Sequence, residues 1–130
     1  MRDQVLIYSR FPKAQMVRIG ARYDLMDGAG KPPIETFTAG QLKPVRAMIT
    51  AGGQVIPPAV LDSLPSLGAI ICYGTGYDGV DFAETKKRGI AVGHSPAANA
   101  ASVADIAMTL MLATARRLLP ADNYVRSGGW

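Results

Sequence analysis

The sequence predicts an α/β domain with a mainly parallel, five-stranded sheet flanked by helices, and three observations support this prediction. Short apolar runs, typical of strands buried on both faces, alternate with segments of helical periodicity. Clusters of Gly and Pro separate these runs. The chain has 130 residues, of which 48% are hydrophobic and 18% charged, and this composition suits one domain with a real core.

The first elements are a buried strand and an amphipathic helix. Residues 4–9 form an apolar run that ends in polar residues, as a buried parallel strand does. Pro12 suits a first helical turn, and apolar residues then recur at helical spacing as far as Tyr23. The turn formers of 27–33 predict a surface loop, followed by a brief second strand near 34–37.

The following segments repeat this rhythm. We expect a third strand at 46–50 that breaks at 51–53, a short helix from Pro57 through Leu64, a fourth strand at 67–73, a helix over 81–88 and a fifth strand at 90–94. Because the carboxyl ends of parallel strands share one edge of the sheet, the glycines of 52–53 and 74–79 are expected to meet there and outline a site.

A long apolar helix, plus the segment that leads into it, follows the sheet. Ser102 and Asp105 have the spacing of a capping box, and the helix is expected to run to Arg117. It is apolar on nearly every face, so a second domain or a partner subunit is expected to pack on it. The apolar stretch is interrupted by polar residues and is shorter than the roughly 20 residues that cross a bilayer, so we predict no membrane span.

Charge and cysteine content exclude several classes of protein. The net charge is +4, but the basic residues are dispersed, and the run Lys86-Lys87-Arg88 falls in the last turn of a predicted helix, where cations complement the dipole. We therefore expect no nucleic-acid partner. The single cysteine, Cys72, excludes an internal disulfide and a cysteine-based zinc site, fits a cytoplasmic setting, and is expected to be a small buried hydrophobe.

The segment 74–79 reads G-x-G-x-x-G between a predicted strand and a predicted helix, a pattern typical of dinucleotide-binding turns. Such a site needs an acidic residue about 20 residues further on, and the window 94–98 contains none. Asp78 and Asp81 would also oppose a pyrophosphate. The backbone amides at Thr75, Gly76 and Tyr77 instead suit a single small anion such as a carboxylate. The alternative is a tight turn in which Asp78 or Asp81 caps the next helix.

Several motifs occur in a fixed order over residues 70–130. They are Gly74-Thr75-Gly76-Tyr77-Asp78-Gly79-Val80-Asp81, Lys87-Arg88-Gly89-Ile90-Ala91-Val92, Ser95-Pro96, Ser102-Val103-Ala104-Asp105, Leu112-Ala113 and Arg116-Arg117. This series resembles the family of D-isomer-specific 2-hydroxyacid dehydrogenases, and in particular glyoxylate/hydroxypyruvate reductases. The resemblance implies a flavodoxin-like substrate domain over residues 1–98. Residues 99–130 would be a linker and a long helix leading into a nucleotide-binding domain that is absent, so that the chain is truncated.

The resemblance also implies site residues, cofactors and partners. Backbone amides around Gly74, Thr75 and Gly76 would hold the carboxylate of a small 2-oxo or 2-hydroxy acid, and Gly52 would line the same pocket. Val103 would lie near the nicotinamide of NAD or NADP. The helix 102–118 would form a homodimer contact. The implied reaction is hydride transfer between the nicotinamide and the substrate.

The chain departs from the family pattern at the catalytic residues. The acid/base His, its Glu and the carbonyl-polarising Arg of the family match no position here, so we expect no catalytic residue, no metal site, no cofactor bound to this chain alone and negligible turnover. His94 does not match the catalytic His and is expected to be structural or solvent-facing. The alternatives are a free-standing flavodoxin-like module that binds small anions or a partner, and an assembly element that acts through the long helix alone.

Overall fold

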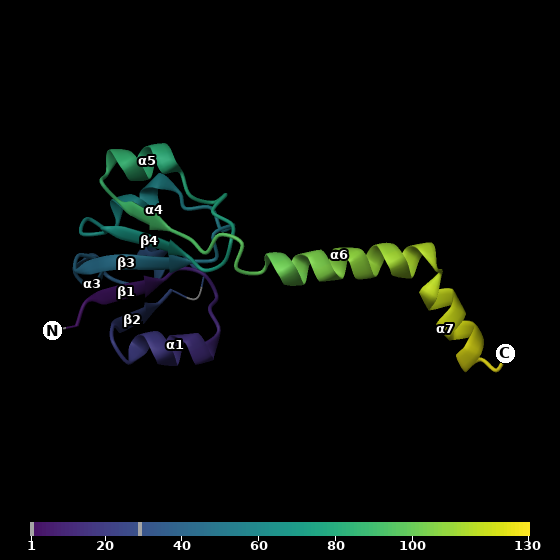
Figure 1. The fold of residues 1–130 in the computed structure, drawn as a ribbon. Helices are drawn as coiled ribbons and strands as arrows, with labels where there is room; N and C mark the ends of the chain where they lie inside the picture. Colours follow the sequence, from purple (N-terminus) through teal and green to yellow (C-terminus); the bar gives the residue numbers. More distant parts are fainter. Residues whose placement is uncertain (1, 29) are drawn as a thin grey trace. The chain divides into compact units, whose positions relative to one another are not determined.

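A computed structural model describes residues 2–28 and 30–130 of the chain. The chain divides into two compact units, the first ending at Pro96 and the second spanning Ala97–Trp130 (Figure 1). The first unit contains a five-stranded sheet in the order β2-β1-β3-β4-β5, in which all neighbouring strands are parallel. The strands are β1 (Gln4–Ile7), β2 (Asp24–Asp27), β3 (Val45–Thr50), β4 (Ala69–Cys72) and β5 (Ala91–Gly93). This order is that of the flavodoxin-like doubly wound fold, so the predicted fold class is confirmed.

Helices connect the strands and cover both faces of the sheet. Successive side chains of β1 point to opposite faces. Val5 and Ile7 pack with residues of α1 on one face, whereas Leu6 packs with Leu42 and Val60 on the other. The helices of this unit are α1 (Lys13–Gly20), α2 (Pro33–Thr36), α3 (Ala39–Leu42), α4 (Pro58–Asp62) and α5 (Phe82–Lys87).

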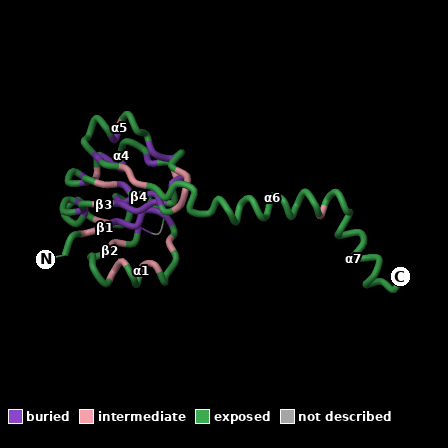
Figure 2. Tube along the Cα trace, viewed as in Figure 1, coloured by how far each residue is buried: buried purple, intermediate pink, exposed green. Residues whose placement is uncertain are grey.

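The core of the first unit lies along β1, β3 and β4. Leu6, Val45, Met48 and Ile70 have no exposed surface, and the buried segments gather in these strands (Figure 2). Thr50, the last residue of β3, is equally buried although it is polar. A buried polar side chain needs a hydrogen-bond partner, and the loops at this end of the sheet must supply one for Thr50.

The predicted second strand is wrong. Residues 33–36 form α2, and the second strand of the sheet is Asp24–Asp27, which pairs with β1 with Gln4 opposite Asp24. Pro33 lies in the first turn of α2, where its missing N–H is no loss, so a proline pair that we assigned to a loop starts a helix instead. Only two residues of β2 are even partly buried, too few to stand out as an apolar run.

The second unit consists of α6 (Ala100–Ala115) and α7 (Leu118–Arg126). The long apolar helix is confirmed, but its limits differ from the prediction. Ser102 lies inside α6, whose N-cap is Asn99, so the predicted capping box does not form. The helix ends before Arg117, which has a left-handed conformation with φ of 49° and separates α6 from α7. No helix in the described part of the chain is long and apolar enough to cross a membrane.

Candidate functional site

The candidate site lies at the carboxyl edge of the sheet, after β3 and β4 and next to the point where the strand order reverses between β1 and β3. Doubly wound folds bind ligands at such a switch point because the loops on either side diverge there. Two loops meet at this edge: the β3 loop (residues 51–56) and the glycine loop (residues 74–79) that follows β4. The structure brings Gly52, Gly74, Thr75 and Gly76, which the sequence predicted as site residues, into these two loops.

The two loops interlock through their backbones. The Gly79 N–H donates to the Gly52 carbonyl oxygen at 2.8 Å, and the Ile56 N–H donates to the Gly79 carbonyl oxygen at 3.0 Å. Gly52 has a φ of 66°, and a Cβ at this position would collide with the Gly76 carbonyl. A Cβ at Gly79 would collide with the Gln54 carbonyl. Glycine is therefore required at both positions by close backbone approach.

Ser9 anchors the β3 loop from beneath. Its side chain is buried, and its Oγ lies 3.1 Å from Thr50 Oγ1, 2.7 Å from Gln54 Oε1 and 2.8 Å from the Ala51 N. The Ser9 hydroxyl donates to the Gln54 oxygen, so the Thr50 hydroxyl and the Ala51 N–H must both donate to Ser9. Every buried polar atom of this cluster then has a partner, which fixes the start of the loop.

The carbonyl groups of the glycine loop are tied back to β5 and its flank. The Ser95 N–H donates to the Gly74 carbonyl oxygen at 2.9 Å, and Nδ1 of His94 lies 3.0 Å from the Thr75 carbonyl oxygen. In a trans peptide the carbonyl and the following N–H point in opposite directions. The N–H groups of Thr75 and Gly76 are therefore directed away from β5, and neither finds an acceptor among the described residues.

The backbone N–H of Gly52, like those of Thr75 and Gly76, has no acceptor among the described residues. The Ala51 carbonyl accepts from the Gly53 N–H at 2.6 Å. Backbone amides without an acceptor, on adjacent loops, are the kind of donor from which anion-binding sites are built. Such donors suit an anion with two oxygens better than a pyrophosphate. The N–H of Gly79, the last glycine of the motif, donates to the Gly52 carbonyl and is not free to bind a phosphate.

Aromatic rings border the glycine loop. Phe11, after β1, packs edge-on against Tyr73 with centroids 4.6 Å apart, and Tyr77 packs edge-on against His94 at 4.8 Å and Phe82 at 5.3 Å. Tyr73 and Tyr77 are about half exposed, so Tyr73 is a rim residue and not part of the core. The glycine loop therefore has aromatic surface beside it.

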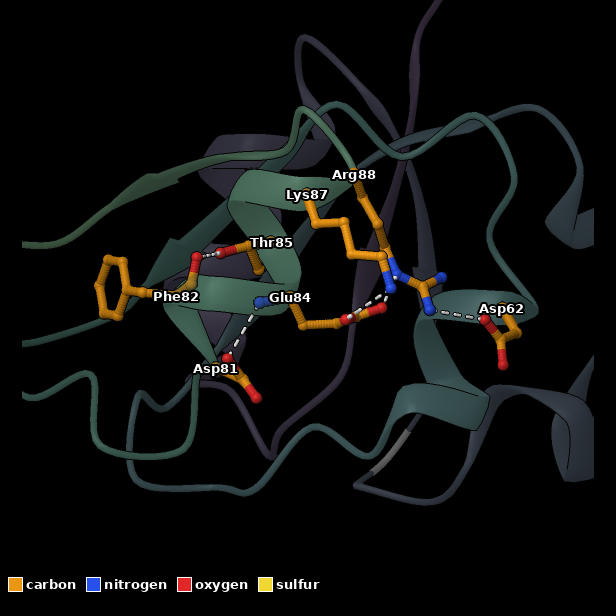
Figure 3. Close-up of polar contacts among 7 residues, drawn as sticks. All are labelled: Asp62, Asp81, Phe82, Glu84, Thr85, Lys87 and Arg88. Atoms are coloured by element: carbon orange, nitrogen blue, oxygen red, sulfur yellow. Dashed lines mark hydrogen bonds and ion pairs between the residues drawn. The ribbon is translucent and has the colours of Figure 1, made fainter.

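Two acidic residues after the loop, Asp81 and Glu84, have structural roles. Asp81 accepts the Glu84 N–H at 3.0 Å and caps α5, as one of the sequence alternatives predicted (Figure 3). Glu84 in turn accepts from Arg88, which also reaches Asp62 of α4 at 2.8 Å. Hydrogen bonds to Asp62 and Glu84 raise the pKa of the Arg88 guanidinium above its ordinary value.

Cys72 lies directly before the glycine loop, at the end of β4. Its side chain is 1% exposed, so the predicted small buried hydrophobe is confirmed, and burial raises the pKa of its thiol. A raised pKa keeps the sulfur protonated and poorly nucleophilic. No group of three or more His, Cys, Asp or Glu side chains that could hold a metal occurs in residues 2–28 and 30–130.

The sequence prediction missed residues that shape this site. Ser9 and Gln54 fix the β3 loop, and His94 and Ser95 hold the glycine loop. Two signals were available in the sequence: the polar end of the first apolar run, at Ser9, and the motif Ser95-Pro96. Val103 lies on α6 in the second unit and is half exposed, so the structure describes it only within that unit.

Comparison with known sequences identifies a matching family. The model of the D-isomer specific 2-hydroxyacid dehydrogenase catalytic domain matches residues 5–121. A glyoxylate reductase of Thermococcus litoralis is 33% identical over 131 residues, which cover 100% of this chain and 40% of that protein. A glyoxylate/hydroxypyruvate reductase of Arabidopsis thaliana is 33% identical over 106 residues, 82% of this chain and 33% of that protein.

Solved structures give the same result. A 2-hydroxyacid dehydrogenase from Ketogulonicigenium vulgare superposes with a TM-score of 0.86 at 29% identity, covering 100% of this chain and 41% of the other. An NADPH-dependent glyoxylate/hydroxypyruvate reductase from Sinorhizobium meliloti, solved with NADP and malonate, gives 0.83 at 28% identity, covering 100% and 40%. The chain thus spans about 40% of the length of these proteins.

Proposed function

Because the chain belongs to the D-isomer specific 2-hydroxyacid dehydrogenase family, we propose that it supplies the substrate-carboxylate site of an NAD(P)-dependent oxidoreductase. The reaction proposed for the intact protein is hydride transfer between the nicotinamide and a small 2-oxo or 2-hydroxy acid such as glyoxylate or hydroxypyruvate. This chain contributes the subsite that recognises the acid group shared by all these substrates.

One observation carries the proposal: the amides of Gly52, Thr75 and Gly76 lack acceptors while the carbonyls beside them are tied back. An ionised carboxylate accepts hydrogen bonds through two oxygens, and bonds to a charged acceptor are the stronger kind. Gly74 precedes these donors, and its φ of 122° is accessible to glycine and strained for other residues. Fixed amides also hold the substrate in one orientation, so that the carbon that exchanges hydride faces away from the loop.

The glycine loop does not fit the pyrophosphate of a dinucleotide. The last glycine of the motif, Gly79, donates its N–H to Gly52, and the carboxylates of Asp78 and Asp81 flank the turn. We propose that NAD or NADP and the acid/base residues lie in protein outside these 130 residues, and that Val103 is this chain's own contact with the nicotinamide. The chain alone is then inactive and binds no cofactor.

The proposal also includes the oligomeric state of the protein and its location in the cell. The apolar side chains of α6, among them Ile106, Leu110 and Met111, are more than half exposed. We propose that a second copy of the protein packs on this helix and forms a homodimer. A reduced, buried Cys72 fits a cytoplasmic location.

The proposal is tested by titrating the ¹⁵N-labelled 130-residue chain with glycolate and following its amide resonances. The resonances of Gly52, Thr75 and Gly76 should shift and saturate together at millimolar glycolate. The methyl ester of glycolate, which lacks the charge, serves as the matched control and should leave them in place. Equal shifts with both ligands, or shifts with neither, would rule out a carboxylate site in this loop.

A turnover assay tests the prediction of inactivity. The chain is mixed with glyoxylate or hydroxypyruvate and NADH or NADPH, and absorbance of the reduced nicotinamide is followed. We expect no decay above the enzyme-free rate. Robust turnover would show that the acid/base residues lie within these 130 residues after all.

A further inference from the structure

His94, after β5, contacts the glycine loop through its imidazole ring. Nδ1 of His94 lies 3.0 Å from the Thr75 carbonyl oxygen, and the ring packs edge-on against Tyr77. We propose that His94 is a positioning residue that directs the Gly76 amide toward the bound carboxylate by holding the Thr75 carbonyl. This inference rests on the carboxylate site proposed above and adds to it a side chain that acts through the backbone.

The argument follows from the geometry of one peptide unit. The Thr75 carbonyl and the Gly76 N–H belong to the same planar trans peptide and point in opposite directions. Fixing the carbonyl on the β5 side therefore fixes the N–H on the opposite side. Glycine at position 76 restricts the backbone little, so a hydrogen bond from another residue is needed to fix the orientation of this peptide.

The neighbouring peptides are held differently. The Gly74 carbonyl accepts from the backbone N–H of Ser95, and the Gly76 carbonyl abuts Gly52. Within the described glycine loop, the Thr75 carbonyl is the one held by a side chain. This hold can therefore be removed by substitution while the backbone contacts on either side remain.

The contact also assigns the hydrogen on the imidazole. A carbonyl oxygen only accepts, so Nδ1 must carry the hydrogen and donate it. The neutral ring is then the Nδ1–H tautomer, with Nε2 bare. The edge contact with Tyr77, which itself packs against Phe82 of α5, keeps the ring in the orientation that the hydrogen bond requires.

Two matched variants separate the hydrogen bond from the ring contact. His94→Asn places an amide nitrogen where Nδ1 stood and removes the ring, whereas His94→Phe keeps a ring against Tyr77 and removes the donor. We expect glycolate to bind the Asn variant within about twofold of the parent chain, and the Phe variant about threefold to tenfold more weakly, as the loss of one net hydrogen bond predicts. The weakening in the Phe variant should be accompanied by a smaller shift of the Gly76 amide.

The reverse order, with Phe binding normally and Asn weakly, would overturn the inference and leave the carboxylate site standing. A second measurement needs no ligand: the ¹⁵N shifts of the His94 ring in the neutral form should show hydrogen on Nδ1. A bare Nδ1 would overturn the inference whether or not glycolate binds. Loss of glycolate binding in the parent chain, with Nδ1 protonated, would instead overturn the proposed function and leave the hold on Thr75 intact.

Discussion

Gly52 joins the two loops of the site because it has no side chain. Its left-handed backbone and its contact with the Gly76 carbonyl leave no room for a Cβ. The neighbouring Gly53 differs, since a Cβ there would meet nothing within 4 Å. The structure therefore requires glycine at position 52 and not at position 53, a difference that the sequence Gly52-Gly53 alone could not reveal.

Gly52→Ala should destabilise the chain by about 2 kcal/mol or more, because the strained backbone and the displaced Gly76 peptide add together. Gly53→Ala, the control one residue away, should change the free energy of unfolding by less than about 0.5 kcal/mol. Urea unfolding followed by circular dichroism measures both. Equal losses in the two variants would contradict the close contact between the loops.

Cys72 gives a dependence of stability on pH. Burial raises its pKa above the ordinary 9.0, so the folded state prefers the neutral thiol. A group with a raised folded pKa contributes stability that is complete below the unfolded pKa and is lost as the pH rises through the folded pKa. We expect the parent chain to lose more stability between neutral pH and about pH 10 than Cys72→Ala loses, measured by urea unfolding at each pH. Parallel losses would show that Cys72 titrates equally in both states.

At the scale of elements, Arg88 joins α5 to α4. Its guanidinium bonds Glu84 one turn earlier in α5 and Asp62 at the end of α4 (Figure 3). The adjacent Lys87 makes only a 3.8 Å contact with Glu84 and is 78% exposed. A planar guanidinium can serve two carboxylates at once, which a single exposed ammonium does poorly.

Arg88→Met should therefore lower the melting temperature measurably, because the guanidinium that joins Asp62 to Glu84 is lost. Lys87→Met, which removes a cation of similar length next to it, should leave the melting temperature within error. Thermal unfolding followed by circular dichroism distinguishes them. A larger loss in the Lys87 variant would show that helix propensity or net charge, and not the ion pairs of Arg88, determines the change in melting temperature.

The sequence predicted the elements that carry a local pattern. β1, β3 and β4 are short apolar runs, and this hydrophobic pattern alone predicts that they are strands. β2 could not be predicted in this way because only Leu25 and Met26 pack inward, and its strand conformation depends on pairing with β1. The end of the long helix was expected at Arg117, close to the observed end of α6, but α7 was not predicted, because a non-glycine residue with positive φ gives no sequence signal for a turn between two helices.

The site was predictable to the same extent. The glycine loop has a motif, and its amides follow from that motif alone. Ser9 and Gln54 meet across a separation of 45 residues, and His94 meets Thr75 across 19, so their roles depend on the sheet being assembled. Backbone donors could be anticipated from the chain, whereas the side chains that orient them could not.

At the scale of the whole molecule, the apolar surface of α6 predicts self-association. Ile106→Glu with Leu110→Glu should shift the chain from dimer to monomer in sedimentation velocity at micromolar concentration, because charge on an apolar contact is costly to bury. Val17→Glu, at a more exposed apolar residue of α1, should leave the association state unchanged. A monomeric parent chain, or equal effects of both changes, would contradict a dimer through α6.

Hydrogen bonds at the carboxyl edge link the segments that follow β1, β3, β4 and β5. Ser9 after β1 holds Ala51 after β3, Gly52 accepts from Gly79 after β4, and Gly74 accepts from Ser95 after β5. A local opening that breaks one of these bonds loosens its neighbours. These donor amides should therefore exchange with deuterium as one cooperative group, with similar protection and a shared response to denaturant. The segments of the candidate site should then open and close together. Any ligand that slows amide hydrogen exchange at one strand end should slow it at the others.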